Sequence, residues 1–311
     1  MGLSVGILRP TIVRIAHHPW FRRLATQTRP GRAVARRFVA GETLAEAMAV
    51  ARTLGEEGIA AMLDHLGENA GTQLQALAAR EAYLSALGAI ADATDLDAAI
   101  SVKLTQLGLD ESIERCWGNL APILDAAAAR RSSVMIDMES HGYVDDTLVV
   151  LARAHERYER TGVALQAYLR RTEQDAFGLP PGCRVRLVKG AYLEPSDVAH
   201  ERKQDVDVAF ARLFSTLLQR NHPIDVATHD PGLIEGVRER VDHLDGGWSR
   251  VEFQMLYGVR RDLQAQLAGQ GYPVRVYIPY GTEWYPYLTR RLAERPANLW
   301  FFFSNLVRTA R

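Results

Sequence analysis

The chain has 311 residues, of which 47% are hydrophobic and 24% are charged, as is ordinary for a soluble globular protein with a full core. Its 37 basic and 37 acidic residues balance, and two cysteines, Cys116 and Cys183, form neither a metal-ligand pattern nor a disulfide framework. No apolar run is as long as a transmembrane helix, and no signal-peptide core is present, so we expect a cytoplasmic protein.

The N-terminal part of the chain is rich in arginine. Residues 1–41 carry eight arginines and no acidic residue. Such an arm is typical of a targeting peptide, a nucleic-acid arm, a membrane-surface helix, or a helical arm that pairs with an acidic body. The rest of the chain has no basic stripe interleaved with aromatic residues, which argues against nucleic acid. We therefore predict a helical arm over residues 1–55, with peripheral contact at the inner face of the membrane as the second interpretation.

Eight short apolar runs follow, and each has the composition of a strand. They are rich in β-branched residues and are bounded by Gly, Pro, Asn, Asp or charged residues. The predicted strands are Gly58–Leu63, Ala99–Leu104, Ser133–Met138, Val163–Leu169, Val185–Val188, Ile224–Ala227, Val251–Leu256 and Val274–Ile278. The stretches between them have apolar residues at helical spacing, among them Gln73–Leu87, Asp145–Arg160, Ser196–Arg220 and Arg260–Ala268.

Near-continuous apolar strands that alternate with helices indicate a parallel sheet covered by helices. Eight such units favour a (β/α)8 barrel of the TIM type over an open sheet. No Gly-x-Gly-x-x-Gly motif follows an early strand, which argues against a dinucleotide-binding doubly wound fold. The predicted organisation is an α/β barrel over residues 56–311, preceded by the helical arm over residues 1–55.

Polar residues occur at the ends of nearly all the predicted strands, where a barrel places its active site. Lys103 ends the second strand, and in this position it suits a snorkelling residue, a Schiff-base lysine or an anchor for an anion. Arg186 points to the inside of the barrel in the fifth strand and needs an acceptor there, which Asp137 can supply. His229 and Asp230 follow the sixth strand, but no His-x-His, Cys-rich or multi-carboxylate set supports a metal site.

The stretch that begins at Trp284 predicts a further helix. Pro286 suits its first turn, and Tyr287, Arg290, Arg291 and Glu294 share one face at spacings of three, four and seven residues. This face suits either an ordinary solvated surface or a planar charged clamp for a carboxylate. Together with the strand-end cations, the two arginines suit a phosphate-bearing anionic cofactor and a small anionic substrate.

Nine segments, taken together and in this order, resemble the proline dehydrogenase family, the flavin-dependent enzymes of proline catabolism. The resemblance runs from about residue 37 to residue 306. The segments are Arg37–Thr43, Leu66–Glu68, Ser101–Leu104, Asp137–Glu139, Gln166–Tyr168, Arg186–Tyr192, Ala227–Asp230, Phe253–Gly258 and Tyr287–Leu292.

The resemblance implies a distorted barrel that binds FAD non-covalently at the strand C-termini, with the last helix over the barrel mouth. Arg290 and Arg291 would bind the carboxylate of L-proline, and Glu68 would pair with Arg290 as a gate. The other residues implied on the substrate side are Lys103, Tyr277, Tyr287, Leu256, Ala191, Asp137 and Glu294. Those implied on the cofactor side are Gln166, Arg186, Lys189, Gly190, Ala191, Thr228, His229, Asp230 and Gln254.

The implied reaction transfers a hydride from proline to N5 of FAD and yields Δ1-pyrroline-5-carboxylate. The electrons would pass to a membrane quinone, and the product would pass to a separate pyrroline-5-carboxylate dehydrogenase. The Arg-rich arm and the segment Trp300–Phe303 are candidates for membrane contact, although an aromatic run also suits core packing. Two alternatives remain open: a flavin-independent lyase or aldolase with a Schiff base on Lys103 or Lys189, and an anion-binding barrel without catalysis.

Overall fold

Eight parallel strands close into a barrel in the computed structural model, which describes residues 35–67 and 70–294, the last five by their backbone alone. Each strand pairs with its neighbours in the chain, and the barrel closes where Met62 of β1 lies opposite Tyr277 of β8. The strands are β1 (Ala60–His65), β2 (Ala98–Val102), β3 (Val134–Ile136), β4 (Thr161–Gln166), β5 (Val185–Val188), β6 (Ile224–Ala227), β7 (Val251–Leu256) and β8 (Val274–Tyr280). The predicted (β/α)8 fold is confirmed.

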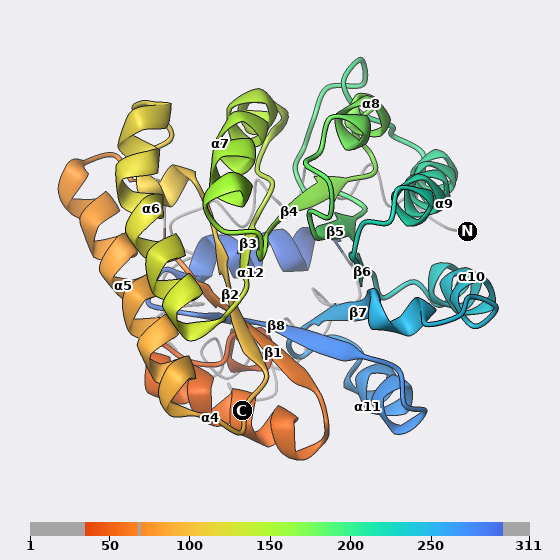
Figure 1. Cartoon of the computed structure of the whole chain (residues 1–311), viewed down its shortest axis with the longest axis horizontal. Coiled ribbons are helices and arrows are strands. Elements are labelled where there is room, and N and C mark those ends of the chain that lie inside the picture. The colour runs from red at the N-terminus through yellow and green to blue at the C-terminus, as the bar shows by residue number, and fades with distance from the viewer. Residues whose placement is uncertain (1–34, 68–69, 295–311) are drawn as a thin grey trace, which may run out of the picture.

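Helices surround the strands, and the last helix has a different position (Figure 1). The ring consists of α4 (Leu44–Glu56), α5 (Gln73–Asp92), α6 (Ile113–Arg130), α7 (Val144–Arg157), α8 (Thr172–Phe177), α9 (Lys203–Gln219), α10 (Pro231–Val241) and α11 (Arg261–Gly269). The last helix, α12 (Trp284–Glu294), lies across the centre of the view in Figure 1. Its residue Tyr287 lines a cavity together with residues at the C-terminal ends of the strands, so α12 lies over the barrel mouth, as predicted.

Side-chain caps explain where several helices begin. Thr43 accepts a hydrogen bond from the backbone N–H of Glu46, and the Glu46 carboxylate accepts one from the N–H of Thr43, so α4 starts with a capping box. Asp230 caps α10, and Pro231 occupies its first turn, where a missing N–H has no cost. These local signals start α4 and α10 directly after residues that lie near the ends of β8 and β6.

Several predicted boundaries differ from the structure by a few residues, and two of these differences have a clear cause. The fourth strand ends at Gln166 and not at Leu169, because the chain turns there, and Leu169 forms an isolated antiparallel bridge with Ala199. Helix α9 starts at Lys203 and not at Ser196. Residues 196–202 instead pair with the turn after β4, where His200 N–H donates to the Tyr168 carbonyl over 2.7 Å. Tertiary pairing thus overrides the helical pattern before residue 203.

Inside the barrel, an apolar cluster lies beside β1 to β3, whereas β5 to β8 carry mostly polar side chains. Met62, Ala99 and Met135, from β1 to β3, form an apolar cluster inside the barrel, against which Tyr277 packs. The inward positions of β5 to β8 instead carry mostly charged or amide side chains, namely Arg184, Arg186, Asp225, Glu252, Gln254 and Arg275. The large apolar core lies outside the barrel, between the strands and the helices.

A second, smaller hydrophobic cluster holds α12 over the mouth. Trp284, Tyr287 and Leu288 of α12 pack there with Phe38 and Leu66. Two backbone hydrogen bonds tie the same region together: the N–H of residue 40 donates to the carbonyl of residue 279 over 2.9 Å, and that of residue 281 donates to residue 41 over 3.0 Å.

The predicted arm over residues 1–55 is described only from residue 35 onward, and its helix α4 packs against β1 and β8. Its boundary with the barrel stays a prediction. Within the described part of the chain, no helix is long and apolar enough to cross a membrane. The described residues also contain no cluster of three or more His, Cys, Asp or Glu side chains arranged to hold a metal ion.

Candidate active site

A cavity of about 610 Å³ opens at the C-terminal ends of the strands. Its size is in the range of small-molecule and cofactor sites. Every predicted site residue whose side chain is described lines it. These residues are Lys103, Asp137, Gln166, Arg186, Lys189, Gly190, Ala191, Thr228, His229, Asp230, Gln254, Leu256, Tyr277 and Tyr287.

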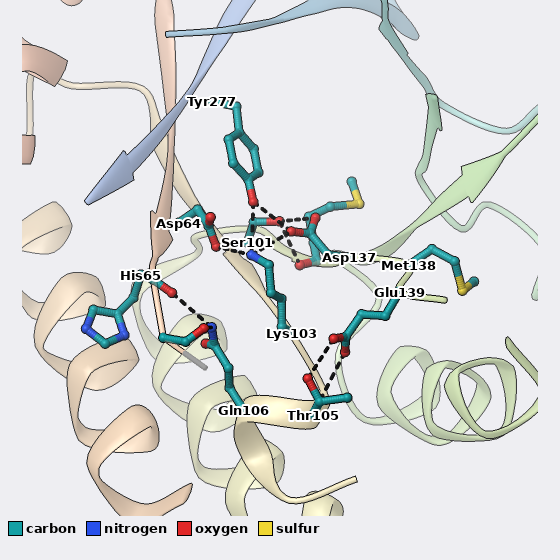
Figure 2. A network of polar contacts seen from close by, with 12 residues as sticks. Asp64, His65, Ser101, Lys103, Thr105, Gln106, Asp137, Met138, Glu139 and Tyr277 are labelled. Atoms are coloured by element: carbon teal, nitrogen blue, oxygen red, sulfur yellow. Dashed lines mark hydrogen bonds and ion pairs between the residues drawn. The ribbon is translucent and has the colours of Figure 1, made fainter. Parts of the chain in front are cut away.

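Lys103 lies at the centre of a polar network in the wall of this cavity (Figure 2). Its Nζ is 2.6 Å from Asp64 Oδ1, 3.3 Å from Asp137 Oδ2 and 3.3 Å from the Tyr277 hydroxyl. The Tyr277 hydroxyl donates to Asp137 Oδ2 over 2.7 Å, and Ser101 Oγ donates to Asp137 Oδ1 over 2.7 Å. Residues from β1, β2, β3 and β8 thus meet at one point, although they lie far apart in the sequence.

The electrostatics of this network keep both charges in place. Burial alone lowers the pKa of Lys103, but the negative neighbours, foremost Asp64, outweigh it and hold that pKa well above its usual value. Burial raises the pKa of Asp137, yet Lys103 and Arg186 overcome that effect and hold the pKa below its ordinary value. Lys103 is therefore an ammonium ion and Asp137 a carboxylate at neutral pH, so neither is a ready nucleophile or base.

Arg186 is held on three sides, and one of its nitrogens remains for a ligand. Its Nε donates to Gln254 Oε1 over 2.7 Å, and its Nη1 donates to Asp137 Oδ1 over 2.6 Å and to Ser101 Oγ over 3.0 Å. The guanidinium also lies 5.1 Å from the centre of the Tyr277 ring. Its Nη2 is buried and has no hydrogen-bond partner among the described residues. A buried donor of this kind calls for an acceptor.

Gln166 adds a buried hydrogen-bond acceptor that, like Arg186 Nη2, has no partner among the described residues. Its Nε2 donates to the carbonyls of Met138, over 3.0 Å, and Glu139, over 2.7 Å, which fixes the amide and leaves its buried Oε1 without a partner among the described residues. Glu139 in turn accepts hydrogen bonds from the N–H and the hydroxyl of Thr105. Burial raises the pKa of this carboxyl. The loops after β2 and β3 are thereby joined next to Lys103.

A second charged cluster lies at the ends of β5 and β6. Lys189 Nζ is 2.5 Å from Asp207 and 2.9 Å from Asp230, and Lys203 pairs with the same two carboxylates. Burial raises the pKa of Asp230, but the hydrogen bonds from Lys203 and Lys189 prevail and hold it far below its ordinary value. Asp230 also caps α10, so the positive N-terminus of that helix points to this end of the cavity.

Gly190 lies in the floor of the cavity, and no other residue can replace it without strain. Gly190 has a φ of +118°, and a Cβ there would lie 2.1 Å from the Tyr168 ring. Ala191 follows it and lines the cavity. At the ends of β6 and β7, the backbone N–H of Leu256 donates to His229 Nε2 over 3.0 Å, which fixes the imidazole next to the cavity.

Four predicted residues cannot be placed by their side chains. Glu68 lies outside the described residues, and the backbone of Arg290, Arg291 and Glu294 belongs to α12 while their side chains are not described. Their roles stay predictions.

The sequence analysis also missed residues that the structure adds to the site. Asp64 and Ser101 hold Lys103 and Asp137, and Lys203 and Arg260 line the cavity. A usable signal existed for Asp64, because an acidic residue inside an apolar strand needs a cation. Lys203 begins a helix after a long loop, and nothing local distinguishes it from a surface lysine.

Comparisons with known proteins point to one family. The model of the proline dehydrogenase family matches residues 47–302. The chain is 39% identical over 277 residues to proline dehydrogenase 1 of Bacillus subtilis subsp. natto, which covers 88% of this chain and 91% of that protein. It is 37% identical over 308 residues to the proline dehydrogenase of Deinococcus radiodurans, which covers 97% of this chain and 98% of the relative.

The fold also matches a solved structure. The crystal structure of proline utilization A from Bdellovibrio bacteriovorus, inactivated by N-propargylglycine, superposes with a TM-score of 0.79 at 22% identity. The match covers 93% of this chain and 36% of that chain, so this protein spans about a third of that one, and the likeness concerns the fold. On the family match and the two close relatives, this chain belongs to the proline dehydrogenase family and is an enzyme of that type.

Proposed function

We propose that the cavity binds FAD non-covalently and that the protein oxidises L-proline to Δ1-pyrroline-5-carboxylate. The observation that carries the proposal is the buried Nη2 of Arg186, a cationic donor in the cavity wall without a partner among the described residues. Gln166 Oε1 adds a buried acceptor in the same wall. A flavin ring carries acceptors and an N–H at its edge, so both orphan atoms would find partners on it.

The remaining residues of the cofactor side fit the rest of FAD. Gly190 leaves room where a side chain would collide with Tyr168, so a cofactor can pass close to the backbone. Lys189 and the N-terminus of α10, with Thr228 and His229 beside it, would hold the phosphate and adenosine portions. Gln254 would line the cofactor site next to Arg186, to which it is hydrogen bonded.

The substrate would bind between the flavin and α12. Tyr287 of α12 lines the cavity, and Arg290 and Arg291 follow it by three and four residues, so helix periodicity supports a position at the mouth for both. They would bind the proline carboxylate, while Tyr277, Leu256 and Ala191 would enclose the ring. Asp137 and Glu294 would orient the cations, and Glu68 would pair with Arg290 as a gate that closes over the substrate.

FAD, when bound, would supply N5 as the hydride acceptor for the ring carbon next to the proline nitrogen. The chain's contribution is to align the substrate, to exclude water and to place the Arg186 cation where negative charge appears on reduction. No side chain in the described network is a free base, since Asp137 is already paired with both Lys103 and Arg186. Proline would therefore bind with its amine already neutral.

The electrons would go to a membrane quinone and the product to a separate pyrroline-5-carboxylate dehydrogenase. In this proposal the protein works in the cytoplasm with peripheral contact at the inner face of the membrane. Residues 1–34 and 300–303, the candidates for that contact, lie outside the described residues. Co-sedimentation with anionic liposomes, with and without residues 1–34, tests the arm, and equal binding of both forms would exclude a part for it.

An anaerobic absorbance spectrum of the purified protein tests the main proposal. We expect a flavin spectrum that L-proline bleaches and that a quinone analogue restores. A protein without flavin would contradict the proposal, and so would a flavin that proline leaves oxidised. The Schiff-base lyase gains no support from the geometry, because Lys103 is paired with Asp64 and Asp137, and Lys189 is paired with Asp207 and Asp230. Borohydride trapping of a carbonyl substrate on Lys103 or Lys189 would reverse that judgement.

A further inference from the structure

A row of polar side chains continues inside the barrel below the cavity, and the proposed chemistry makes no use of its lower half. Glu252 and Gln254 are two residues apart on β7, so both side chains point to the barrel interior. Arg275 lies beside them on β8. The side chains of Glu252 and Arg275 are only 14% and 12% exposed, so this pair is held away from bulk water.

The contacts in this row form one continuous path to Arg186. Arg275 binds both oxygens of Glu252, with its Nε 2.8 Å from Oε1 and its Nη2 3.3 Å from Oε2. Glu252 Oε1 also accepts a hydrogen bond from Gln254 Nε2 over 2.8 Å. Gln254 Oε1 then accepts the hydrogen bond from Arg186 Nε over 2.7 Å. Each link joins a donor to an acceptor.

The two charged neighbours allow the Gln254 amide only one orientation. If the amide were reversed, its NH2 group would face the N–H of Arg186 and its oxygen would face the Glu252 carboxylate, which are two repulsive contacts. The acceptor for Arg186 Nε is therefore fixed from below. With Nη1 bound to Asp137 and Ser101, the guanidinium has one position, and Nη2 is the nitrogen left at the cavity wall.

We propose that Glu252 is a positioning residue for Arg186: held by Arg275 and acting through the Gln254 amide, it fixes the guanidinium so that Nη2 faces the cofactor. This inference rests on the proposed function, because it takes the cavity to hold a flavin. A fixed cation stabilises the charge of the reduced cofactor more than a mobile one, since no reorganisation is needed at the moment of transfer.

The first test is Glu252→Gln in the cofactor-bound protein. This change keeps the size of the side chain but turns an amide N–H toward Arg275 Nη2, which is also a donor, so the pair moves apart and loosens its hold on Gln254. We expect the rate of flavin reduction by proline to fall about tenfold and KM for proline to stay within twofold. The reduced cofactor should bind about tenfold more weakly relative to the oxidised one, which lowers the two-electron midpoint potential by about 30 mV.

The second variant, Gln254→Met, breaks the path at its middle and leaves the pair of Glu252 and Arg275 intact. It should reproduce the loss of rate and of potential. Glu252→Gln should then have no further effect in the Gln254→Met background, because a residue that acts through Gln254 loses its influence when the amide is gone. Additive losses in the double variant would overturn the proposal, as would wild-type kinetics and potential in Glu252→Gln.

Asp225→Asn is the matched control for the loss of charge. Asp225 lies opposite Glu252 in the strand register, but its carboxylate pairs with Arg184, over 2.6 Å, and is not a link in the path through Gln254. Asp225→Asn should keep the rate of flavin reduction by proline within twofold of wild type. Any change that it makes to the midpoint potential should be the same in the wild-type and the Gln254→Met backgrounds. A potential shift in Asp225→Asn as large as that in Glu252→Gln would assign the effect to charge alone and overturn the proposal.

A cooperative thermal unfolding transition shows that a variant is folded. If Glu252→Gln does not fold, Gln254→Met tests the same path. The wild-type spectrum separates the two proposals. If wild-type protein carries no flavin that proline bleaches, the proposed function fails. If the wild type is bleached and the variants match it, only the positioning role fails.

Discussion

Lys103 has three polar neighbours, and they decide what its amine can do. Asp64, Asp137 and Tyr277 surround Nζ within 3.3 Å, so the protonated form is favoured and the nitrogen lone pair is not available. The sequence alone left three roles open for this residue. The geometry favours a fixed positive charge at the end of the cavity that we propose for the substrate, which is an electrostatic role and not a covalent one.

Arg291→Met tests the carboxylate clamp at the level of one side chain. Removal of a charge-assisted, bidentate hydrogen bond costs about 1.5–3 kcal/mol, so we expect KM for proline to rise about 10- to 100-fold. Flavin content should not change, since this arginine is proposed to contact only the substrate. Steady-state kinetics and the ratio of flavin to protein absorbance are the measurements. A variant with the wild-type KM would show that the carboxylate binds elsewhere.

Gly190→Ala tests the close passage at the cavity floor. The new Cβ would lie 2.1 Å from the Tyr168 ring, at a φ of +118°. We expect a loss of about 2–4 kcal/mol in the free energy of unfolding and a loss of bound flavin, because strain and overpacking add. Gly236→Ala is the control, since that glycine lies in α10 and an alanine methyl group there would meet no heavy atom within 4 Å apart from the adjacent backbone of its own helix. It should raise stability by about 0.5–1 kcal/mol. Equal urea midpoints for the two variants would contradict the assignment.

At the level of elements, α12 differs from the helices of the ring because it packs on its own cluster. Leu288 is fully buried there, next to Trp284, Phe38 and Leu66. The large core of the barrel does not include these residues. The stability of α12 can therefore vary while the barrel stays folded.

Leu288→Ala should detach α12 more than it destabilises the barrel. The change removes a fully buried side chain, which costs about 2–5 kcal/mol where the site cannot collapse. We expect faster amide hydrogen exchange over residues 284–294 and a higher KM for proline, with little change of exchange in β2 to β6. Uniformly faster exchange across the barrel would show that α12 and the barrel unfold as one unit.

The sequence predicted the elements better than their ends. Strands such as β5 and β6 were predicted at the observed residues, because a short buried run between polar residues has few other interpretations. The start of α9 was predicted at residue 196 and lies at residue 203. Residues 196–202 have a helical pattern, but their hydrogen bonds go to the turn after β4, and pairing between distant segments leaves no local signal.

At the level of the whole molecule, the charged side chains inside the barrel make stability depend on pH. Burial, with Glu252 nearby, raises the pKa of Asp225 to about 6 although Arg184 pairs with it. The unfolded chain releases this proton near its ordinary pKa of 3.8, so between about pH 4 and pH 6 the folded state holds a proton that the unfolded state has lost. In that window the contribution of Asp225 to stability falls as pH rises.

The free energy of unfolding should therefore lose up to about 3 kcal/mol from this group between pH 4 and pH 6. Asp225→Asn should remove the loss, so that the difference between wild type and variant changes across this window and is flat above it. Urea unfolding at several pH values measures this difference. Parallel curves for the two proteins from pH 4 to pH 6 would show that Asp225 is ionised throughout.

The site as a whole was predicted through its pattern, and its internal links were not. A family resemblance identified the residues that line the cavity. It did not identify Asp64, which holds Lys103, or the path from Glu252 to Arg186. Such links depend on which inward-facing residues of neighbouring strands lie side by side. That is decided by the strand register, which the closure of the barrel sets and the sequence does not show.

The cluster that closes the barrel mouth also has a consequence for the order of assembly. Trp284 Nε1 donates to Glu42 Oε1 over 3.3 Å, across 242 residues of sequence. Residues this far apart meet late, because the closure of a long loop must follow the local pairings that shorten it. During synthesis the early partner leaves the ribosome long before α12 exists. Because α12 packs on its own small cluster and not on the large core, we expect it to dock after the strands have closed, so a newly made chain passes through a stage with its cavity open from above.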